Sequence, residues 1–276
     1  MKIKYRFIFL FLSTNCSSDL EYLEKFKGYN SNPRVVETKT FILEKGGNIE
    51  KERNNAPKKV IEFDKEGRII KLVQTKADDK NRVYSEKYIY HINGRVKQME
   101  STRSYDSQLD KKTNYLYNKK NQLIRLDVNN GKVVKQYFYR NGNLIKETVK
   151  ATFKNFYYME YSYDNKNRKI GIKSFNKDGE FKNMVKYYYD KNQNISKSEL
   201  YYEEEKLNSF FIFIKDSYGN TTESKEYSAQ NLDTTLIVHE KTSFIYDNKN
   251  NIVKSTVTSN NSNNSLFTEN TYSYWK

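Results

Sequence analysis

The sequence predicts an all-β fold, a repetitive antiparallel β-hairpin meander that forms one long, twisted and curled sheet. The segment YDNKN occurs at 163–167 and again at 246–250, and looser copies recur along most of the chain. The copies are spaced by about 25 residues, a period at which repeats define a fold. Only two prolines occur in 276 residues, so little interrupts strand pairing. Nine copies with two strands each predict about 18 strands.

Each copy has the features of a strand that ends in a tight turn. Tyr163 follows Tyr161 by two positions, which places both rings on one face of a strand. Asp164 suits the first position of a type I turn, and Asn167 suits the fourth, where the backbone adopts positive φ. The corresponding turn residues are Gly47, Gly67, Gly94, Asn121, Gly142, Asn167, Gln193, Gly219 and Asn250. We therefore interpret the copies as hairpins.

The hairpins predict which residues face each other next to each turn. The loop is expected to have three residues, or two where Asn141 and Gly142 suit a type I′ turn. The predicted pairs are Leu43–Ile49, Phe63–Ile69, Tyr90–Val96, Tyr117–Leu123, Tyr139–Leu144, Tyr163–Lys169, Tyr189–Ile195, Lys215–Thr221 and Tyr246–Ile252. Seven of these join a large apolar residue to an aliphatic one, a combination that stabilises antiparallel ladders.

One pair farther from the turn, aromatic rings are expected to face cations. The predicted pairs are Tyr115–Arg125, Tyr137–Lys146, Tyr187–Lys197 and Phe244–Lys254. Rows of rings and cations offer stacking faces and hydrogen-bond donors, so these residues are candidates for binding a glycan or another envelope component. The alternative is that the lysine stems simply pack on the rings of a wet sheet, as amphipathic side chains do.

The turn segments resemble a known repeat family. FDKEGRI and, with Asn in place of Gly, YDNKNRK resemble the YD repeats of rearrangement-hotspot (Rhs) and teneurin-type proteins. The resemblance covers residues 41–276 and implies a long coiled β-sheet, which in the largest members closes into a shell around a toxin. This chain departs from the pattern, because nine units are few for a shell and Asn or Gln often replaces the turn glycine. Its last residues, YSYWK, are interpreted as a final strand, so no toxin role is expected.

The amino-terminal residues predict export and a lipid anchor. MKIKYR is basic and FIFLFL is apolar, which is typical of a signal peptide, here over 1–15. Cys16, the sole cysteine, resembles the lipobox cysteine of bacterial lipoproteins, although Asn15 stands where Gly or Ala is usual. The alternative is a plain signal peptide with an incidental cysteine. We expect a polar tether over 16–40, a repeat domain over 41–276, and attachment to the outer membrane, facing the periplasm or the surface.

The chain is strongly basic. Its formal net charge is +15, and removing Lys2, Lys4 and Arg6 with the signal peptide leaves 15 − 3 = +12. The lysines are spread through strands and turns rather than gathered in a stripe, which favours a role in keeping exposed strands soluble over nucleic-acid binding. The expected partners are the membrane through the lipid anchor and an anionic polysaccharide or envelope protein, with no nucleic acid.

The sequence carries no recognisable catalytic motif. His91 is expected in a turn and His239 in a strand, and no metalloprotease, nucleophile-elbow, phosphate-loop or dinucleotide motif occurs. The acidic run 203–205 suits a solvated turn, and the turn aspartates suit turn geometry better than Ca²⁺ binding. We expect no catalytic residue, metal or cofactor. The predicted function is a non-enzymatic envelope binding module, and the alternative is a structural or protein-interaction scaffold.

Overall fold

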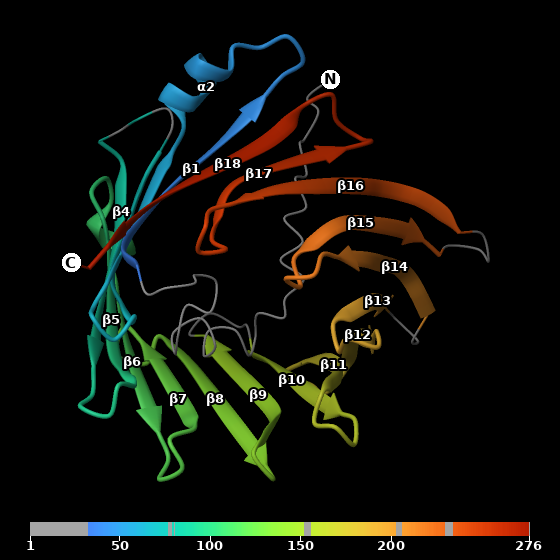
Figure 1. Ribbon diagram of the computed structural model, residues 1–276. Helices are drawn as coiled ribbons and strands as arrows, with labels where there is room; N and C mark the ends of the chain where they lie inside the picture. The colour runs from blue at the N-terminus through green and yellow to red at the C-terminus, as the bar shows by residue number, and fades with distance from the viewer. Residues whose placement is uncertain are drawn as a thin grey trace.

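The chain folds into one antiparallel β-sheet that closes on itself (Figure 1). The computed structural model describes residues 33–76, 79, 81–151, 156–202, 206–229 and 234–275. Within these residues the sheet has 18 strands, and each strand pairs with its neighbours in sequence. The first strand, β1, also pairs with the last, β18. This ring of pairings makes the sheet a barrel.

The strands have similar lengths around the barrel. Strands β1 to β9 span Pro33–Leu43, Lys58–Phe63, Ile69–Thr75, Val83–Tyr90, Val96–Arg103, Lys111–Tyr117, Leu123–Val128, Val133–Arg140 and Asn143–Ala151. Strands β10 to β18 span Phe156–Tyr163, Lys169–Asn176, Phe181–Tyr189, Ile195–Tyr202, Lys206–Lys215, Thr221–Ser228, Thr235–Tyr246, Ile252–Ser259 and Ser265–Tyr274. Strand β1 thus takes up residues 33–40, which the sequence assigned to the tether.

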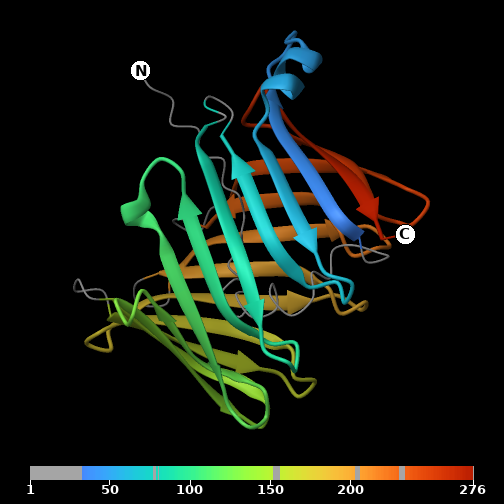
Figure 2. The ribbon, with the colours of Figure 1, turned by 90° about the vertical axis from the view of Figure 1, so that its left-hand side faces the viewer.

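The predicted fold class is confirmed, and the predicted open sheet is wrong. An antiparallel all-β meander of about 18 strands was expected, and this is what forms. The sheet curls until β18 lies beside β1, as Figure 2 shows with the red and blue strands. The right-handed twist between neighbouring strands accumulates around the sheet. Closure then pairs the two edge strands, whose backbone N–H and C=O groups an open sheet would leave exposed.

The first predicted hairpin is also wrong, because Ile49 begins a helix instead of a strand. Helix α2 spans Ile49–Asn55, between β1 and β2. The Asn48 side chain caps it by accepting hydrogen bonds from the backbone N–H groups of Glu50 and Lys51. A short 3-10 helix, η1 (Ser107–Leu109), lies between β5 and β6. Among the described residues, no helix combines the length and hydrophobicity that crossing a membrane requires.

The other eight turns form where the sequence predicts them. The turn residues expected to have positive φ all do: Gly67, Gly94, Asn121, Gly142, Asn167, Gln193, Gly219 and Asn250. At the first position, the Asp164 carboxylate accepts hydrogen bonds from the backbone N–H groups of Lys166 and Arg168, both at 2.9 Å. The predicted pairs next to these turns are confirmed, from Phe63–Ile69 to Tyr246–Ile252.

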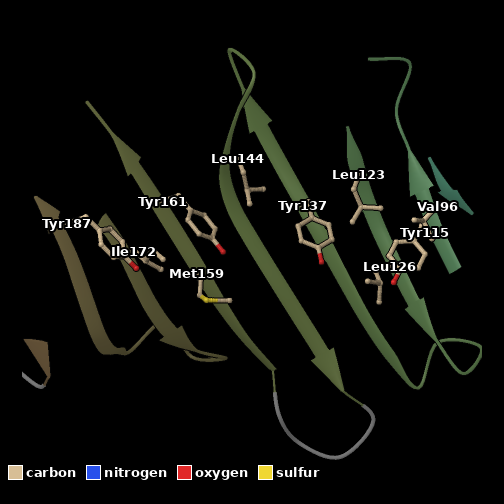
Figure 3. Packing of buried hydrophobic residues seen from close by; sticks show 10 residues of the cluster. All are labelled: Val96, Tyr115, Leu123, Leu126, Tyr137, Leu144, Met159, Tyr161, Ile172 and Tyr187. Carbon is tan, nitrogen blue, oxygen red and sulfur yellow. The ribbon is translucent and has the colours of Figure 1, made fainter. Parts of the chain in front are cut away.

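The two faces of the barrel differ in burial. One face carries a buried cluster, which Figure 3 shows: Val96, Tyr115, Leu123, Leu126, Tyr137, Leu144, Met159, Tyr161, Ile172 and Tyr187. Side chains converge on the concave face of a closed sheet and diverge on its convex face. We therefore place this set on the inner face of the barrel wall.

The outer face carries both charged and apolar side chains. Cross-strand ion pairs lie along it, among them Lys58–Glu37, Lys71–Glu62 and Lys112–Glu100. Leu116, Phe138 and Ile245 on the same face are 54%, 44% and 56% exposed. The outer wall is therefore mixed in polarity.

Candidate binding surface on the outer wall

The predicted pairs of rings and cations do not form. In the structure the ring-bearing residues pair differently: Tyr115 with Leu126, Tyr137 with Glu147, Tyr187 with Ser198, and Phe244 with Ser255. Their expected partners, Arg125, Lys146, Lys197 and Lys254, each lie one ladder position away. Neighbouring positions of a strand point to opposite faces, so the rings and the cations are separated by the barrel wall.

A β-bulge after each turn causes the difference. The ladder skips one residue directly after the confirmed pair: Ile124, Ile145, Ser196 and Val253 in the four hairpins concerned. Shifting a register by one residue moves every following side chain to the other face. The turn residues predict the first pair correctly, but they do not show the extra residue.

The predicted aromatic residues line the inside of the barrel. Tyr115, Tyr137 and Tyr187 are 8%, 3% and 4% exposed and belong to the buried cluster (Figure 3). Tyr117 and Tyr139, which lie nearer the turns, are only half-buried. The rings farther from the turns are therefore the more deeply buried ones. These buried rings contribute to the core and are not exposed on the outer wall.

The predicted cations lie on the outer wall and have other partners there. Arg125 forms an ion pair with Asp127, Lys146 lies over the Tyr158 ring, Lys197 lies over Tyr188 and Phe210, and Lys254 lies over Phe267 and near Glu269. Lys146, Lys197 and Lys254 therefore do lie over rings, but on the convex face and over rings that the sequence did not single out. The sequence does not reveal these contacts because it does not show the bulge that places the cations on this face. On the inner face, the Tyr187 ring has a different cation near it, Lys169, whose Nζ lies 6.0 Å from the ring centre.

The densest group of such contacts lies on β12 to β15. We call it the outer aromatic cluster, and it consists of Tyr188, Tyr201, Phe210, Tyr227, Lys186 and Lys197. Lys186 Nζ lies 4.6 Å from the centre of the Tyr201 ring. Phe210 and Tyr227 stack with ring centres 4.8 Å apart and planes within 11°. Tyr188 is 42% exposed, so the cluster presents ring surface to solvent.

Glu199 holds the cluster together. Its carboxylate accepts hydrogen bonds from the hydroxyls of Tyr188 at 2.5 Å and Tyr201 at 2.6 Å, and it pairs with Lys197 Nζ at 2.7 Å. Burial opposes ionisation, but these hydrogen bonds outweigh it and lower the pKa of Glu199 to about 2. The carboxylate therefore stays charged at neutral pH and fixes two rings and a lysine in one arrangement.

This arrangement suits a ligand with flat apolar faces and polar edges. The rings offer stacking surfaces that are fixed before a ligand arrives, which lowers the entropy lost on binding. Lys186 has no carboxylate within ion-pair distance among the described residues, so its three N–H groups remain open to a ligand.

The remaining candidates from the sequence form no comparable site. His239 Nε2 lies 2.7 Å from Glu223 Oε1 on the outer wall, and Lys225 pairs with the same carboxylate. The His91 ring meets Tyr117 edge to face. Within the described residues, no group of three or more His, Cys, Asp or Glu side chains is placed to hold a metal ion. Cys16 and the acidic run 203–205 lie outside the described residues.

Comparisons with known proteins give no family. No family model and no curated protein matches the sequence. Among solved structures, the chain is similar to porin-like proteins from Bacteroides uniformis (9% identity, 88% of this chain, 99% of that chain, TM-score 0.48) and Bacteroides vulgatus (11%, 85%, 97%, 0.39). It is also similar to part of a TcdB2-TccC3-Cdc42 structure (14%, 83%, 16%, 0.33). At these TM-scores the similarities carry no argument about function.

Proposed function

We propose that the protein is a non-enzymatic binding module of the bacterial cell envelope that holds a glycan on its outer aromatic cluster. The observation that carries the proposal is the exposed Tyr188 ring, which Glu199 fixes beside Lys197. A sugar ring has C–H groups on one face and hydroxyls around its edge. It therefore stacks on aromatic rings while its oxygens accept hydrogen bonds from lysines.

Charge favours an acidic glycan. The chain has a formal net charge of +15, and the two lysines of the cluster lie beside one carboxylate, that of Glu199. Glu199 neutralises Lys197, which leaves the charge of Lys186 uncompensated. A basic surface attracts polyanions and raises their association rate. The resemblance to YD repeats supports a repeat scaffold for this role and contributes nothing about the ligand.

The test compares two exposed rings on the same wall. Tyr188→Ala removes a ring from the cluster, and Phe138→Ala removes a ring of similar exposure (44%) on β8, outside the cluster. Losing one stacking ring costs about 1–3 kcal/mol on other aromatic platforms, so Tyr188→Ala should weaken retention on immobilised acidic glycans about tenfold or more. Phe138→Ala should retain binding. Equal retention by both variants, with unchanged thermal unfolding, would remove the basis of the proposal.

The proposed location rests on the lipobox resemblance. Strand β1 begins at Pro33, on the rim of the barrel that carries the tight turns, since Val35 pairs with Glu62 next to the turn at 64–68. We expect Cys16→Ala to release the protein from the membrane fraction while the barrel stays folded. Stable anchoring takes more than one acyl chain, and lipoprotein maturation supplies several. A variant that stays membrane-bound after a high-salt wash would contradict the lipid anchor.

A scaffold function is the alternative, and exposed apolar residues favour it. Ile212 and Ile214, two residues apart on the outer face of β14, are 38% and 48% exposed. Exposed apolar side chains that lie together mark protein-interaction surfaces when the patch is large. One experiment distinguishes the glycan-binding function from the scaffold function. If Ile214→Lys abolishes capture of an envelope protein and glycan retention is absent throughout, the scaffold role replaces the binding role.

A further inference from the structure

A small cavity opens at the rim opposite the tight turns. It has a volume of about 220 Å³ and lies where β3 and β5 end and β4 begins. Gln74, Lys76, Arg82, Tyr84, Arg103 and Tyr105 line it. Sites for drug-sized ligands measure roughly 300–1,000 Å³, so this cavity suits a ligand about the size of a single six-membered ring. None of these residues belongs to the outer aromatic cluster.

The cavity is positively charged. It has three cations in its lining, and Asp79 pairs with one of them, Arg82, at 3.4 Å. Within the described part of the chain, no carboxylate lies at ion-pair distance from the side chain of Lys76 or Arg103. The Arg103 Nη1 group donates a hydrogen bond to the Leu109 carbonyl at 2.6 Å. A guanidinium has five N–H groups, so the other N–H groups of Arg103 remain available to a ligand.

Two tyrosines give the cavity ring surfaces. The Arg103 guanidinium lies 5.1 Å from the centre of the Tyr84 ring, whose hydroxyl donates to Glu86. Tyr105 is 46% exposed, and Lys76 and Arg82 lie 5.8 and 5.6 Å from its ring centre. The Tyr105 ring thus lies near both Lys76 and Arg82 and is still partly exposed to solvent.

Hydrogen bonds between the loops fix the mouth of the cavity. Ser104 Oγ accepts from the Val83 N–H at 2.9 Å and donates to the Asn81 carbonyl at 2.5 Å. The Arg103 N–H donates to the Asp110 carboxylate at 2.7 Å. These bonds join the end of β5 to the segment before β4, so the backbone segments that carry Arg82 and Arg103 are held next to each other. A site arranged in advance loses less entropy when it binds.

We propose that this rim cavity binds a ring-sized organic oxyanion, whose carboxylate or phosphate contacts Arg103 and Lys76 and whose ring lies against Tyr105. Arginine binds both oxyanions through two parallel hydrogen bonds, and lysine adds a charge that tolerates either geometry. The open face of Tyr105 supplies the ring contact. The site lies away from the outer aromatic cluster and does not depend on glycan binding there.

The test is calorimetric titration of the full-length protein in detergent with glucuronate, glucose 6-phosphate, glucose and inorganic phosphate. We expect one-to-one binding of at least one of the two sugar anions and none of glucose at tenfold higher concentration. Arg103→Gln and Lys76→Gln should each weaken binding about tenfold or more, because each removes a charged donor. Lys87→Gln, on the exposed outer face of β4, and Tyr188→Ala should leave it unchanged.

Each other outcome counts against the proposal. Absence of binding, or binding that Arg103→Gln and Lys76→Gln both leave intact, overturns the site. Lys76 is exposed, so its replacement tests the cavity even if Arg103→Gln disturbs folding. Inorganic phosphate that binds as tightly as glucose 6-phosphate overturns the ring contact. Weakening by Lys87→Gln equal to that by Lys76→Gln would show diffuse charge attraction and no site.

Discussion

Three of the tyrosines that precede a turn donate a hydrogen bond to the hairpin before their own. The hydroxyls of Tyr90, Tyr163 and Tyr189 donate to the carbonyls of Ile69, Leu144 and Lys169 at 2.5, 2.9 and 2.7 Å. In each case the acceptor is the residue that forms the first ladder pair after the preceding turn. Phenylalanine would fill the same space and leave that carbonyl without this donor. The bond gives a physical reason for tyrosine at these positions, because it joins each of these units to the one before it.

The fold disfavours the charged form of Glu226. It lies on the inner face of β15, and its Oε2 is buried with no hydrogen-bond partner among the described residues. Burial, assisted by the nearby Glu240, raises the pKa of Glu226. A carboxyl group whose pKa is higher in the folded than in the unfolded protein destabilises the fold above the folded pKa. This penalty disappears below the unfolded pKa.

Glu226→Gln should therefore raise the midpoint of thermal unfolding at pH 8, and the gain should shrink towards pH 4. Glu223→Gln is the matched control two residues away. Hydrogen bonds from Lys225 and His239 lower the pKa of Glu223, so its replacement should lower the midpoint at pH 8. Unfolding followed by circular dichroism across this pH range checks both signs. A lower midpoint for Glu226→Gln at pH 8 would show that its carboxylate is stabilised inside the barrel.

At the scale of the hairpin, turns are predictable from sequence and bulges are not. A turn depends on a few adjacent residues, such as Asp164 and Asn167, whose side chain and backbone preferences are local. The residues at the four bulges, Ile124, Ile145, Ser196 and Val253, are of types that also occur at ordinary strand positions, so they do not mark a bulge. The sequence therefore predicts the type of contact but not its position. Lys146 and Lys197 do lie over aromatic rings, but on the outer face of the barrel, whereas Tyr137 and Tyr187 lie on the inner face.

Gln193 offers a test of the turn at 190–194. Its φ is +65°, a conformation that costs a residue with a side chain roughly 1 kcal/mol or more and costs glycine little. Its N–H bonds to the Asp190 carbonyl at 3.1 Å, and glycine keeps this bond. Gln193→Gly should therefore raise the free energy of unfolding in urea by about 0.5–1 kcal/mol. Lys191→Gly, in the same turn at negative φ, should lower it; a loss of stability in both variants would contradict the turn argument.

At the scale of the whole molecule, closure joins strands from opposite ends of the sequence. Thr38 Oγ1 donates to Asn270 Oδ1 at 2.7 Å, and Phe41 stacks on Phe267 with ring centres 5.5 Å apart. No local pattern predicts these contacts, because they depend on the twist summed over all the strands between them. The hairpin repeat predicts the strands and their order, and only the complete sheet determines that its two ends meet.

A cross-link across the closing pair of strands tests the barrel directly. Thr40 of β1 pairs with Thr268 of β18, and their hydroxyls are 3.4 Å apart. Directly opposed strand residues have the Cβ separation that a disulfide needs. In a Cys16→Ser background, Thr40→Cys with Thr268→Cys should form an intramolecular disulfide on mild oxidation, detected by mass spectrometry of the linked peptides.

Thr40→Cys with Ser174→Cys is the control, since Ser174 lies on β11, which pairs only with β10 and β12. An open sheet of 18 strands would hold β1 and β18 about 80 Å apart, at roughly 4.8 Å per strand, and neither pair would link. Linking of the first pair alone therefore distinguishes the closed barrel from an open meander of the same hairpins.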